Sequence, residues 1–341
     1  MLVLREGVVT EVGPPAAEQQ LLVDVPGRGP RAATADTALL GQCEVGDSVI
    51  VNTQAADLSL GSGGFDVVHV NLTRGLGGAG ISGAHVMKLN YSSLQHAVLP
   101  VEDGSDELPT PRPVGVCFLH GQLAPFAWAV AQGRKGTRLG YVQGGGGALP
   151  GGHSKTVIEL RKQGLLAGTI TAGASYGGEA EAITLAGGIA HGIGELGWDA
   201  AVVAPGPGII GSGSRLGHGG MAALEAAHTA LALGCQVVVA PRMSSGDARD
   251  RHQGCSHHTQ TVLDLLLAPV SVAAPPGGAA EITRGCGHTI VELDVELAAY
   301  GESGLPGTTM GRSIEDDPLF FGAALAGGTL LAAQLAPPAS R

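Results

Sequence analysis

The stretch AAVVAPGPGIIGSGSRLGHGGMAALEAAHTALALGCQVVVAP, residues 200–241, decides the fold of the larger part of this chain. Two short valine-rich runs, residues 200–205 and 236–241, flank a segment rich in the helix formers alanine and leucine. A buried strand, a loop, a helix and a second buried strand in this order predict a parallel sheet covered by helices. The glycine-rich loop follows the first strand, where open α/β sheets hold their ligands.

The same alternation continues on both sides of this stretch. Further buried strands are predicted at residues 114–119, 137–143, 165–172, 271–275 and 288–297. Helices are predicted at residues 125–132, 153–163, 179–193, 256–267 and 319–335. Small and polar residues follow the strands, whereas the connections from helix to strand are short and plain. We therefore expect one edge of the sheet to carry the chemistry of the protein.

Residues 1–105 have a different pattern. Short runs with β-branched residues lie at 2–12, 19–25, 48–53, 65–72 and 85–91, with turn signals between them. This pattern predicts a small β-barrel or sandwich. Residues 106–113, which contain three prolines, read as an extended linker. The predicted fold class is therefore α/β: a small β-barrel-like domain at 1–105, a linker at 106–113, and a Rossmann-like parallel α/β domain at 114–341.

Composition excludes several functions. The formal net charge is −11, which disfavours nucleic acid as a partner because the phosphate backbone would be repelled. The five cysteines form no C-x-x-C pair, and the first residues lack the apolar core of a signal peptide, so we expect reduced thiols and a cytoplasmic location. The apolar run from Leu319 to Leu335 is rich in alanine and glycine and reads as a buried helix, so no membrane partner is expected. We also expect a homo-oligomer.

The strongest candidate site is RMSSGDARDRHQGCSHH, residues 242–258, which contains three Arg, two Asp and three His. Asp247 or Asp250 paired with His252 or His257 would suit proton transfer, because a carboxylate orients an imidazole and raises its basicity. Arginines in the same segment, Arg242 and Arg249, would hold an anion. The alternative is a structural network of ion pairs that holds a long loop in place.

Two glycine-rich loops supply further candidates for anion binding at helix starts. The first loop offers Gly151, Gly152, Ser154 and Lys155, although Ser154 would equally serve as an ordinary helix cap, and the spacing of a Walker motif is not met. The second loop offers Gly206, Gly208, Gly211, Ser214 and Arg215, with a close-packed turn as the alternative.

Residues 206–211 satisfy G-x-G-x-x-G after a strand and before a predicted helix. With 57 glycines in 341 residues this motif is a weak signal for a dinucleotide. Arg242 stands where an acidic residue is expected, which would suit the 2′-phosphate of NADP.

A metal site is a further alternative. His252, His257 or His258 together with Asp247 have the right donor atoms, but adjacent histidines on a helix point in different directions, and no zinc-type spacing such as H-E-x-x-H occurs. We therefore assign no metal and leave the cofactor unknown.

Four long segments carry a resemblance. Residues 46–72, 85–95, 141–157 and 242–259 together resemble a family of bacterial proteins of unknown function. The resemblance extends over most of the chain and implies no activity, so no catalytic residue is carried over from it.

The residues favour an enzyme of the transferase or hydrolase type that acts on a small anionic ligand, phosphorylated or nucleotide-like, by acid/base chemistry. One alternative is a non-catalytic ligand-binding or regulatory homo-oligomer, and another is an NADP-dependent oxidoreductase. All three readings require the glycine loops and the 242–258 segment to meet at one cleft.

Overall fold

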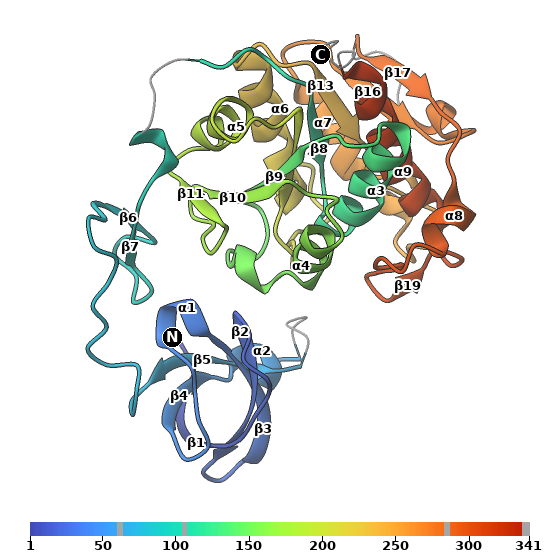
Figure 1. Cartoon of the computed structure of the whole chain (residues 1–341). Coiled ribbons are helices and arrows are strands. Elements are labelled where there is room, and N and C mark those ends of the chain that lie inside the picture. Colours follow the sequence, from blue (N-terminus) through green and yellow to red (C-terminus); the bar gives the residue numbers. More distant parts are fainter. Residues whose placement is uncertain (60–63, 104–107, 283–286, 336–341) are drawn as a thin grey trace. The chain divides into compact units, whose positions relative to one another are not determined.

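The chain forms two compact units, Met1–Leu99 and Pro100–Arg341. The computed structural model describes residues 1–59, 64–103, 108–282 and 287–335, and each unit is considered by itself (Figure 1). An α/β fold with a barrel at the N-terminus and a Rossmann-like parallel sheet at the C-terminus is confirmed. The first residues of the expected linker, 106 and 107, lie outside the described residues.

The described part of the first unit contains a closed barrel of five strands in the order β1-β2-β3-β5-β4. The strands are β1 (Leu4–Val12), β2 (Glu18–Val25), β3 (Gly29–Asp36), β4 (Ser48–Asn52) and β5 (Asp66–Asn71). Alternate side chains of β2 and β4 point inward, as the period of a strand requires, and small aliphatic residues such as Val23, Ala35 and Val49 fill the interior. Closure pairs β3 with β5 in parallel, whereas the other strand pairs are antiparallel.

Short elements complete this unit and lead into the next. They are α1 (Thr37–Leu40), α2 (Gln54–Asp57), the paired strands β6 (Val86–Lys88) and β7 (His96–Val98), and η1 (Val101–Asp103). The predicted strand at 85–91 is thus a small hairpin partner and not a wall of the barrel, because β6 pairs with β7 alone among the described strands.

The second unit is built on a sheet of eight strands, within the described residues, in the order β11-β10-β9-β12-β8-β13-β16-β17. The strands are β8 (Val114–Cys117), β9 (Leu139–Gly144), β10 (Gly168–Ala172), β11 (Ala180–Ala182), β12 (Ala200–Pro205), β13 (Val237–Ala240), β16 (Ser271–Ala274) and β17 (Thr289–Glu292). The neighbouring strands pair in parallel throughout. The central strands are buried on both faces, which explains their unbroken valine and alanine runs.

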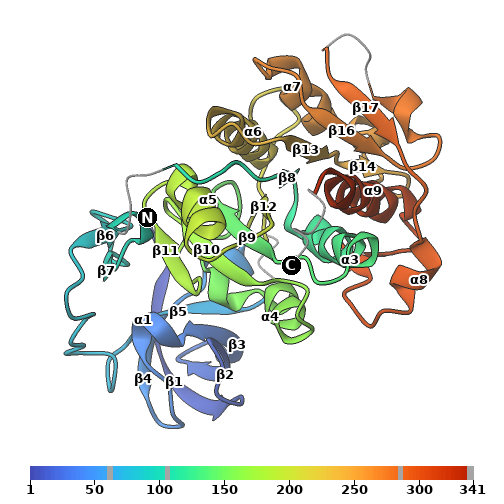
Figure 2. The ribbon, with the colours of Figure 1, turned by 45° about the horizontal axis from the view of Figure 1, so that its top comes forward.

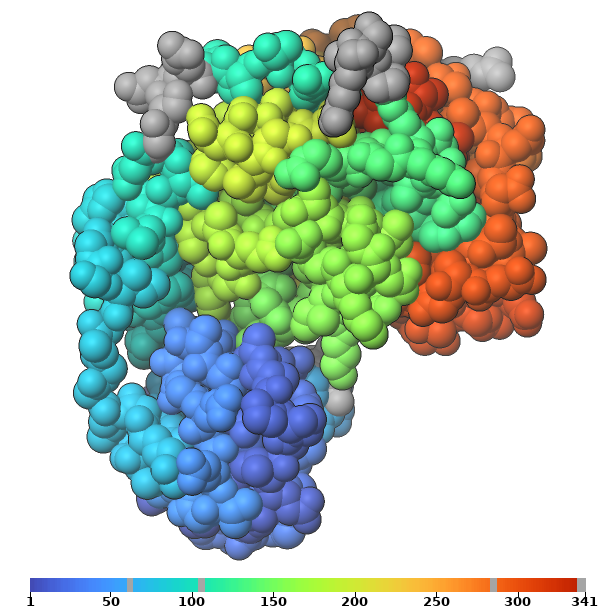
Figure 3. Space-filling view, in the orientation of Figure 1, coloured from blue at the N-terminus to red at the C-terminus, as the bar shows by residue number. Residues whose placement is uncertain are grey.

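Helices cover both faces of this sheet. One face carries α3 (Leu123–Gly133), α4 (Lys155–Lys162) and α9 (Pro318–Gln334), and the other carries α5 (Leu185–Gly194), α6 (Ala222–Ala232) and α7 (His257–Leu265) (Figure 2). Helix α4 lies at the surface of the unit in the view of Figure 3. The remaining short elements are η2 (His120–Gln122), η3 (Gly151–His153), η4 (Gly219–Met221), β14 (Met243–Ser244), η5 (Asp250–His252), β15 (Gly254–Cys255), η6 (Gly278–Glu281), α8 (Leu297–Gly301), β18 (Thr308–Thr309) and β19 (Arg312–Ser313).

Glycines allow large side chains into the layers between sheet and helices. The side chain of Trp198, which is 2% exposed, occupies the space beside Gly140, Gly168 and Gly192. A Cβ atom at Gly140 or Gly192 would overlap the indole ring. This slot fixes the distance between α5 and the strands β9 and β10.

The C-terminal apolar run forms α9, a buried helix as predicted. It lies against α3, where Gly327 and Gly328 permit a close approach to Phe126. In the part of the chain that the structure describes, no helix combines the length and the apolar character needed to span a bilayer.

The order of the strands creates a crevice at the carboxyl edge of the sheet. From β9 the chain passes through α4 to β10, whereas from the adjacent β12 it passes through α6 in the opposite direction to β13. The loops after β9 and β12 therefore leave the sheet toward opposite faces. Such a switch point is where open α/β sheets bind their ligands.

Candidate functional site

The charged segment that follows β13 is held by a buried carboxylate from the C-terminal part of the chain. Asp317 is fully buried and accepts hydrogen bonds from the Ser244 hydroxyl (2.7 Å), the Ser245 amide (2.8 Å) and Arg312 Nε (2.9 Å). Asp317 directly precedes α9, but its side chain caps no helix. It fixes the start of the loop instead.

Asp247 is the centre of an arginine network. Its carboxylate accepts two hydrogen bonds from Arg249 (2.8 and 2.7 Å), and its Oδ2 lies 3.5 Å from Arg242 and 3.7 Å from Arg312. The Arg249 hydrogen bonds outweigh burial and lower the pKa of Asp247 well below its ordinary range. The predicted pairing of Asp247 with His252 is not formed, because arginines occupy the carboxylate.

His252 is 1% exposed and has a different partner, since its Nδ1 shares a 2.7 Å hydrogen bond with the Ser256 hydroxyl. Burial and the nearby positive charge of Arg242 and Arg249 lower its pKa to about 3. The other predicted carboxylate, Asp250, lies exposed on η5. The sequence thus identified a real cluster, but the partners inside it are Asp–Arg and His–Ser and not Asp–His.

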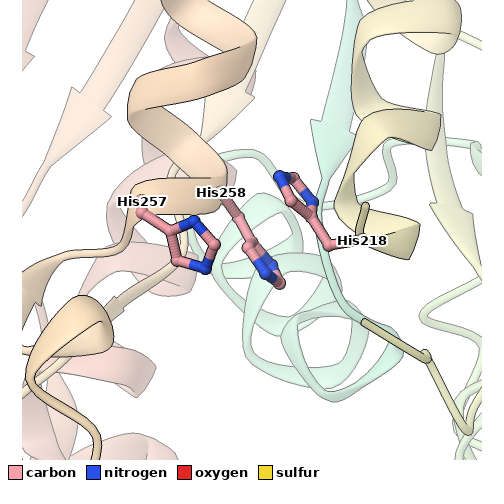
Figure 4. A group of neighbouring side chains, drawn as sticks. All are labelled: His218, His257 and His258. Carbon is pink, nitrogen blue, oxygen red and sulfur yellow. The ribbon is translucent and has the colours of Figure 1, made fainter. Parts of the chain in front are cut away.

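Three histidines from two distant segments meet beside this network. His257 and His258 begin α7, and His218 comes from the loop before α6, so that the ring of His258 lies between those of His257 and His218 (Figure 4). The rings of His218 and His258 are stacked with centroids 3.7 Å apart, and His257 lies 4.4 Å from His258 and 5.3 Å from His218. One ring nitrogen of each lies within 4.8 Å of the others. The expectation that adjacent histidines diverge is wrong here.

The surroundings of this group favour the neutral form of its imidazoles. Burial, followed by the charge of Arg242, lowers the pKa of His258 to about 2. Burial likewise lowers the pKa of His218 and of His257. A neutral imidazole keeps one nitrogen lone pair free, which is the form that accepts a hydrogen bond or binds a metal ion.

Arg242 contacts the histidine cluster through His258 and is 3% exposed. Its Nη1 donates to His258 Nδ1 at 2.9 Å, and its Nε has no hydrogen-bond partner among the described residues. Burial is the largest influence on this guanidinium and lowers its pKa to about 10, and the charges of Arg249, Arg251 and Arg312 act in the same direction. The negative charge of Asp247 raises the pKa of Arg242, but the Asp247 carboxylate lies closer to Arg249 than to Arg242. The site therefore carries positive charge that its own carboxylate only partly balances.

The two glycine loops interlock at the crevice between β9 and β12. The Ala148 amide donates to the Pro207 carbonyl at 2.5 Å, and a Cβ atom at Gly147 or Gly219 would overlap the backbone of the opposite loop. These loops enclose a cavity of about 720 Å³. It is lined by Gly146, Gly147, Ala148, Gly208, Ile210, Gly211, Gly217, His218 and Gly219. His218 thus connects the crevice to the histidine cluster.

The predicted residues of the second glycine loop differ in their roles. Gly208 and Gly211 line the crevice, and Gly206 contacts the first loop at Ala148. The helical turn begins at Gly219 and not directly after Gly211, so the strand-turn-helix setting expected for a dinucleotide fingerprint is wrong.

Ser214 and Arg215 lie further along the same loop. The Ser214 hydroxyl accepts from the Gly217 amide inside its own turn, and the exposed Arg215 pairs with Asp264 at 2.9 Å. Arg215 also lines a second cavity of about 560 Å³, together with Arg251 and His257. The histidine cluster therefore borders one cavity through His218 and another through His257.

The predicted residues of the first glycine loop are arranged around the start of α4. Gly151 and Gly152 form η3, and Lys155 is exposed at the first helical position. Ser154 is buried: its hydroxyl accepts from the Val157 amide and shares a 2.6 Å hydrogen bond with His120 Nε2. Of these residues, none lines the two cavities described above.

Three members of the site, His218, Arg312 and Asp317, are not among the predicted site residues. They lie 24 or more residues from the charged segment, so no local spacing connects them with it. His218 had a usable signal, since it follows β12 and must therefore reach the same edge as the segment after β13. The expected Glu179–Glu181 helix start is wrong, because Glu181 lies in β11.

The comparisons with known proteins add a family and no activity. No curated protein and no solved structure matches the chain. One family model matches residues 32–328, which is most of the chain and includes both glycine loops, the histidine cluster and the arginine network. The chain therefore belongs to the family described as protein of unknown function (DUF3866).

Proposed function

We propose that this protein is an enzyme of the hydrolase or transferase type, and that it binds a small anionic molecule, phosphorylated or nucleotide-like, in the crevice between β9 and β12. The observation that carries the proposal is the cavity of about 720 Å³ at the switch point of the sheet, bordered by His218. A cytoplasmic location and a homo-oligomeric state belong to the same proposal.

The lining of the crevice suits a ligand that is held close to the backbone. Glycines form most of the wall, so a ligand meets main-chain groups without intervening side chains. The interlocked loops hold their shape through backbone contacts, which limits the cost of ordering them when a ligand binds.

The charge behind the crevice favours an anion. Arg242 contacts His258, His258 stacks on His218, and His218 borders the cavity. A buried guanidinium that is short of hydrogen-bond acceptors is stabilised by a nearby negative ligand.

For a phosphate monoester the reaction would be a displacement at phosphorus. An oxygen of water, or of an acceptor alcohol, forms the new bond to phosphorus while the bond to the ester oxygen breaks. The electron pair of that bond stays on the ester oxygen, which ends with the proton of the attacking group. The site contributes charge stabilisation and orientation to such a step.

A second candidate is a ligand-binding or regulatory protein without catalysis. It is favoured by the state of the predicted proton-transfer residues, because Asp247 is bound by arginines and His252 by Ser256. An NADP-dependent oxidoreductase is less favoured, because the glycine fingerprint does not open a helix.

Thermal unfolding with added ligands tests the proposal. In buffer with EDTA, we expect phosphate or a nucleotide to raise the melting temperature by about 5 °C at a concentration of about 100 Kd, which corresponds to about 2.7 kcal/mol. Turnover of the stabilising compound would then separate the enzyme from the binding protein. If phosphate, nucleotides and NADPH all leave the melting temperature unchanged, the crevice is not an anion site.

Matched glycine variants locate the effect. Gly147→Ala forces the loops apart and should abolish the ligand-induced shift, because its Cβ atom overlaps the opposite backbone. Gly145→Ala is the control, since its Cβ atom meets nothing within 4 Å, and it should keep the shift.

A further inference from the structure

We propose that His218, His257 and His258 bind one divalent transition-metal ion of the zinc type at the side of the crevice, and that this ion and the anionic ligand bind cooperatively. The metal site stands on its own geometry, whereas the cooperativity rests on the proposed function.

The first support is the convergence of three imidazoles. Each offers a ring nitrogen, and these atoms lie within 4.8 Å of one another. His218 and His258 are 6% and 4% exposed, so two of the three donors are deep in the protein (Figure 4). The donors come from separate loops at the same sheet edge, so the fold itself brings them together.

The second support is a set of buried nitrogens without a well-formed hydrogen bond. Both ring nitrogens of His218 and Nε2 of His257 make no hydrogen bond of normal geometry to any described residue. A buried polar atom without a partner is unfavourable, so three of them in one cluster point to a ligand. A metal ion would occupy a lone pair on each ring.

The chemistry of the donors selects the ion. Imidazole nitrogen suits zinc and its first-row neighbours, whereas calcium and magnesium require oxygen ligands. Three histidines leave a fourth position for water or for a substrate oxygen, as in catalytic zinc sites. Both cavities border the group, so a ligand could reach that position through either.

Arg242 is the reason to expect cooperativity. An arginine only donates, so His258 Nδ1 presents a lone pair to Arg242 Nη1. An ion at His258 displaces either the guanidinium from Nδ1 or the proton from Nε2. The positive charge of Arg242 repels a divalent cation bound at His258. An anion bound nearby offsets this repulsion, because the cation and Arg242 both attract it.

Direct titration tests the metal site. The full chain is treated with EDTA, desalted, and titrated with ZnCl₂ by calorimetry, and then with CoCl₂ by visible absorption. We expect one ion per chain, and cobalt bands typical of a tetrahedral site with nitrogen ligands. His257→Gln should weaken Zn²⁺ binding by more than about 100-fold. Loss of a residue that only hydrogen-bonds to a metal ligand already lowers metal affinity by about 10–100-fold, and His257 is a ligand itself.

The control is His191→Gln, which changes a histidine on α5 outside the cluster and should leave Zn²⁺ binding unchanged. His257 is half-buried, so its variant is expected to fold, and circular dichroism verifies this. If the wild-type chain binds Zn²⁺ no more tightly than the folded His257→Gln variant, the metal site is refuted.

The coupling is tested with inorganic phosphate and Arg242→Met. Phosphate should tighten Zn²⁺ binding by at least about tenfold in the wild-type chain. In Arg242→Met, Zn²⁺ alone should bind at least about tenfold more tightly than in the wild-type chain, and the effect of phosphate should be lost.

The two proposals fail separately. A phosphate-induced rise in melting temperature in EDTA, with no Zn²⁺ binding, would leave the proposed function and remove the metal. Zn²⁺ binding without any response to anions would leave the metal site and remove both the coupling and the proposed function.

Discussion

At the scale of single residues, the molecule repeatedly places a carboxylate where burial and hydrogen bonding oppose each other. Asp47 in the barrel is 1% exposed and accepts from the Glu44 amide (2.9 Å), Asn71 Nδ2 (2.8 Å) and Arg74 Nε (2.8 Å). Burial alone would raise the pKa of this carboxyl, but the hydrogen bonds outweigh burial and lower the pKa. Asp47 is therefore bound as an anion.

This arrangement predicts a stability change that depends on pH. The folded pKa of Asp47 is below the unfolded value of about 3.9, so its contribution is present above that value and is lost as the pH falls through the folded pKa. Asp47→Asn should lower the free energy of unfolding by about 1–3 kcal/mol at pH 7. Urea denaturation at pH 7 and under acidic conditions measures the change, and an equal loss at both pH values would contradict the role of the charge.

The histidine cluster also belongs to this scale. Proximity along the chain predicted Asp–His pairs that do not form. A sequence shows which groups are close along the chain, but it does not show that an arginine binds the carboxylate in place of a histidine. Asp247 and His252 are five positions apart, yet they do not pair. Asp247 binds Arg249, and His252 binds Ser256.

At the scale of elements, α9 does more than complete the core. The residue before it, Asp317, binds the start of the loop after β13 through Ser244, Ser245 and Arg312. The last helix of the chain therefore positions the segment that carries Asp247 and His252.

We expect Asp317→Ala to lower the free energy of unfolding by about 2–4 kcal/mol, because it leaves the partly buried Arg312 without its close partner and the Ser244 hydroxyl without its acceptor. Hydrogen exchange should then accelerate in residues 243–249. Asp316→Ala is the matched control: Asp316 is exposed and bonds only to Ser313 among the described residues, so the exchange of the loop should not change. Slow exchange in both variants would show that α9 does not hold the loop.

Most elements were predictable, and the exceptions have physical reasons. The alternation of buried runs and helices identified β8, β9, β10, β12, β13 and β16, because strands buried on both faces must be apolar throughout. Strand β3 was missed, because its alanines have little strand propensity and it is held by pairing with β2 and β5. The edge rule explains why the glycine loops and the histidines lie at the same edge of the sheet, whereas the contribution of Asp317 depends on a distant helix.

At the scale of the whole molecule, each unit has its own hydrophobic core. Valines and alanines fill the barrel, and a separate core joins the sheet of the second unit to its helices. Two cores with separate residues predict two unfolding transitions.

Differential scanning calorimetry should resolve these transitions, and variants should assign them. Gly140→Ala overlaps Trp198 and should cost about 1–3 kcal/mol, which lowers the melting temperature of the α/β unit by about 5 °C. The barrel transition should stay in place in that variant, and Asp47→Asn should move it alone. A single transition that shifts in both variants would show that the units unfold together.

The slot that holds Trp198 has a consequence for such experiments. The chain has two tryptophans, Trp128 and Trp198, and both belong to the second unit, so indole emission monitors that unit and is blind to the barrel. Emission from the dry slot should shift to longer wavelength when the sheet opens. The protein therefore contains a built-in optical reporter that distinguishes loss of the α/β unit from loss of the barrel without any label.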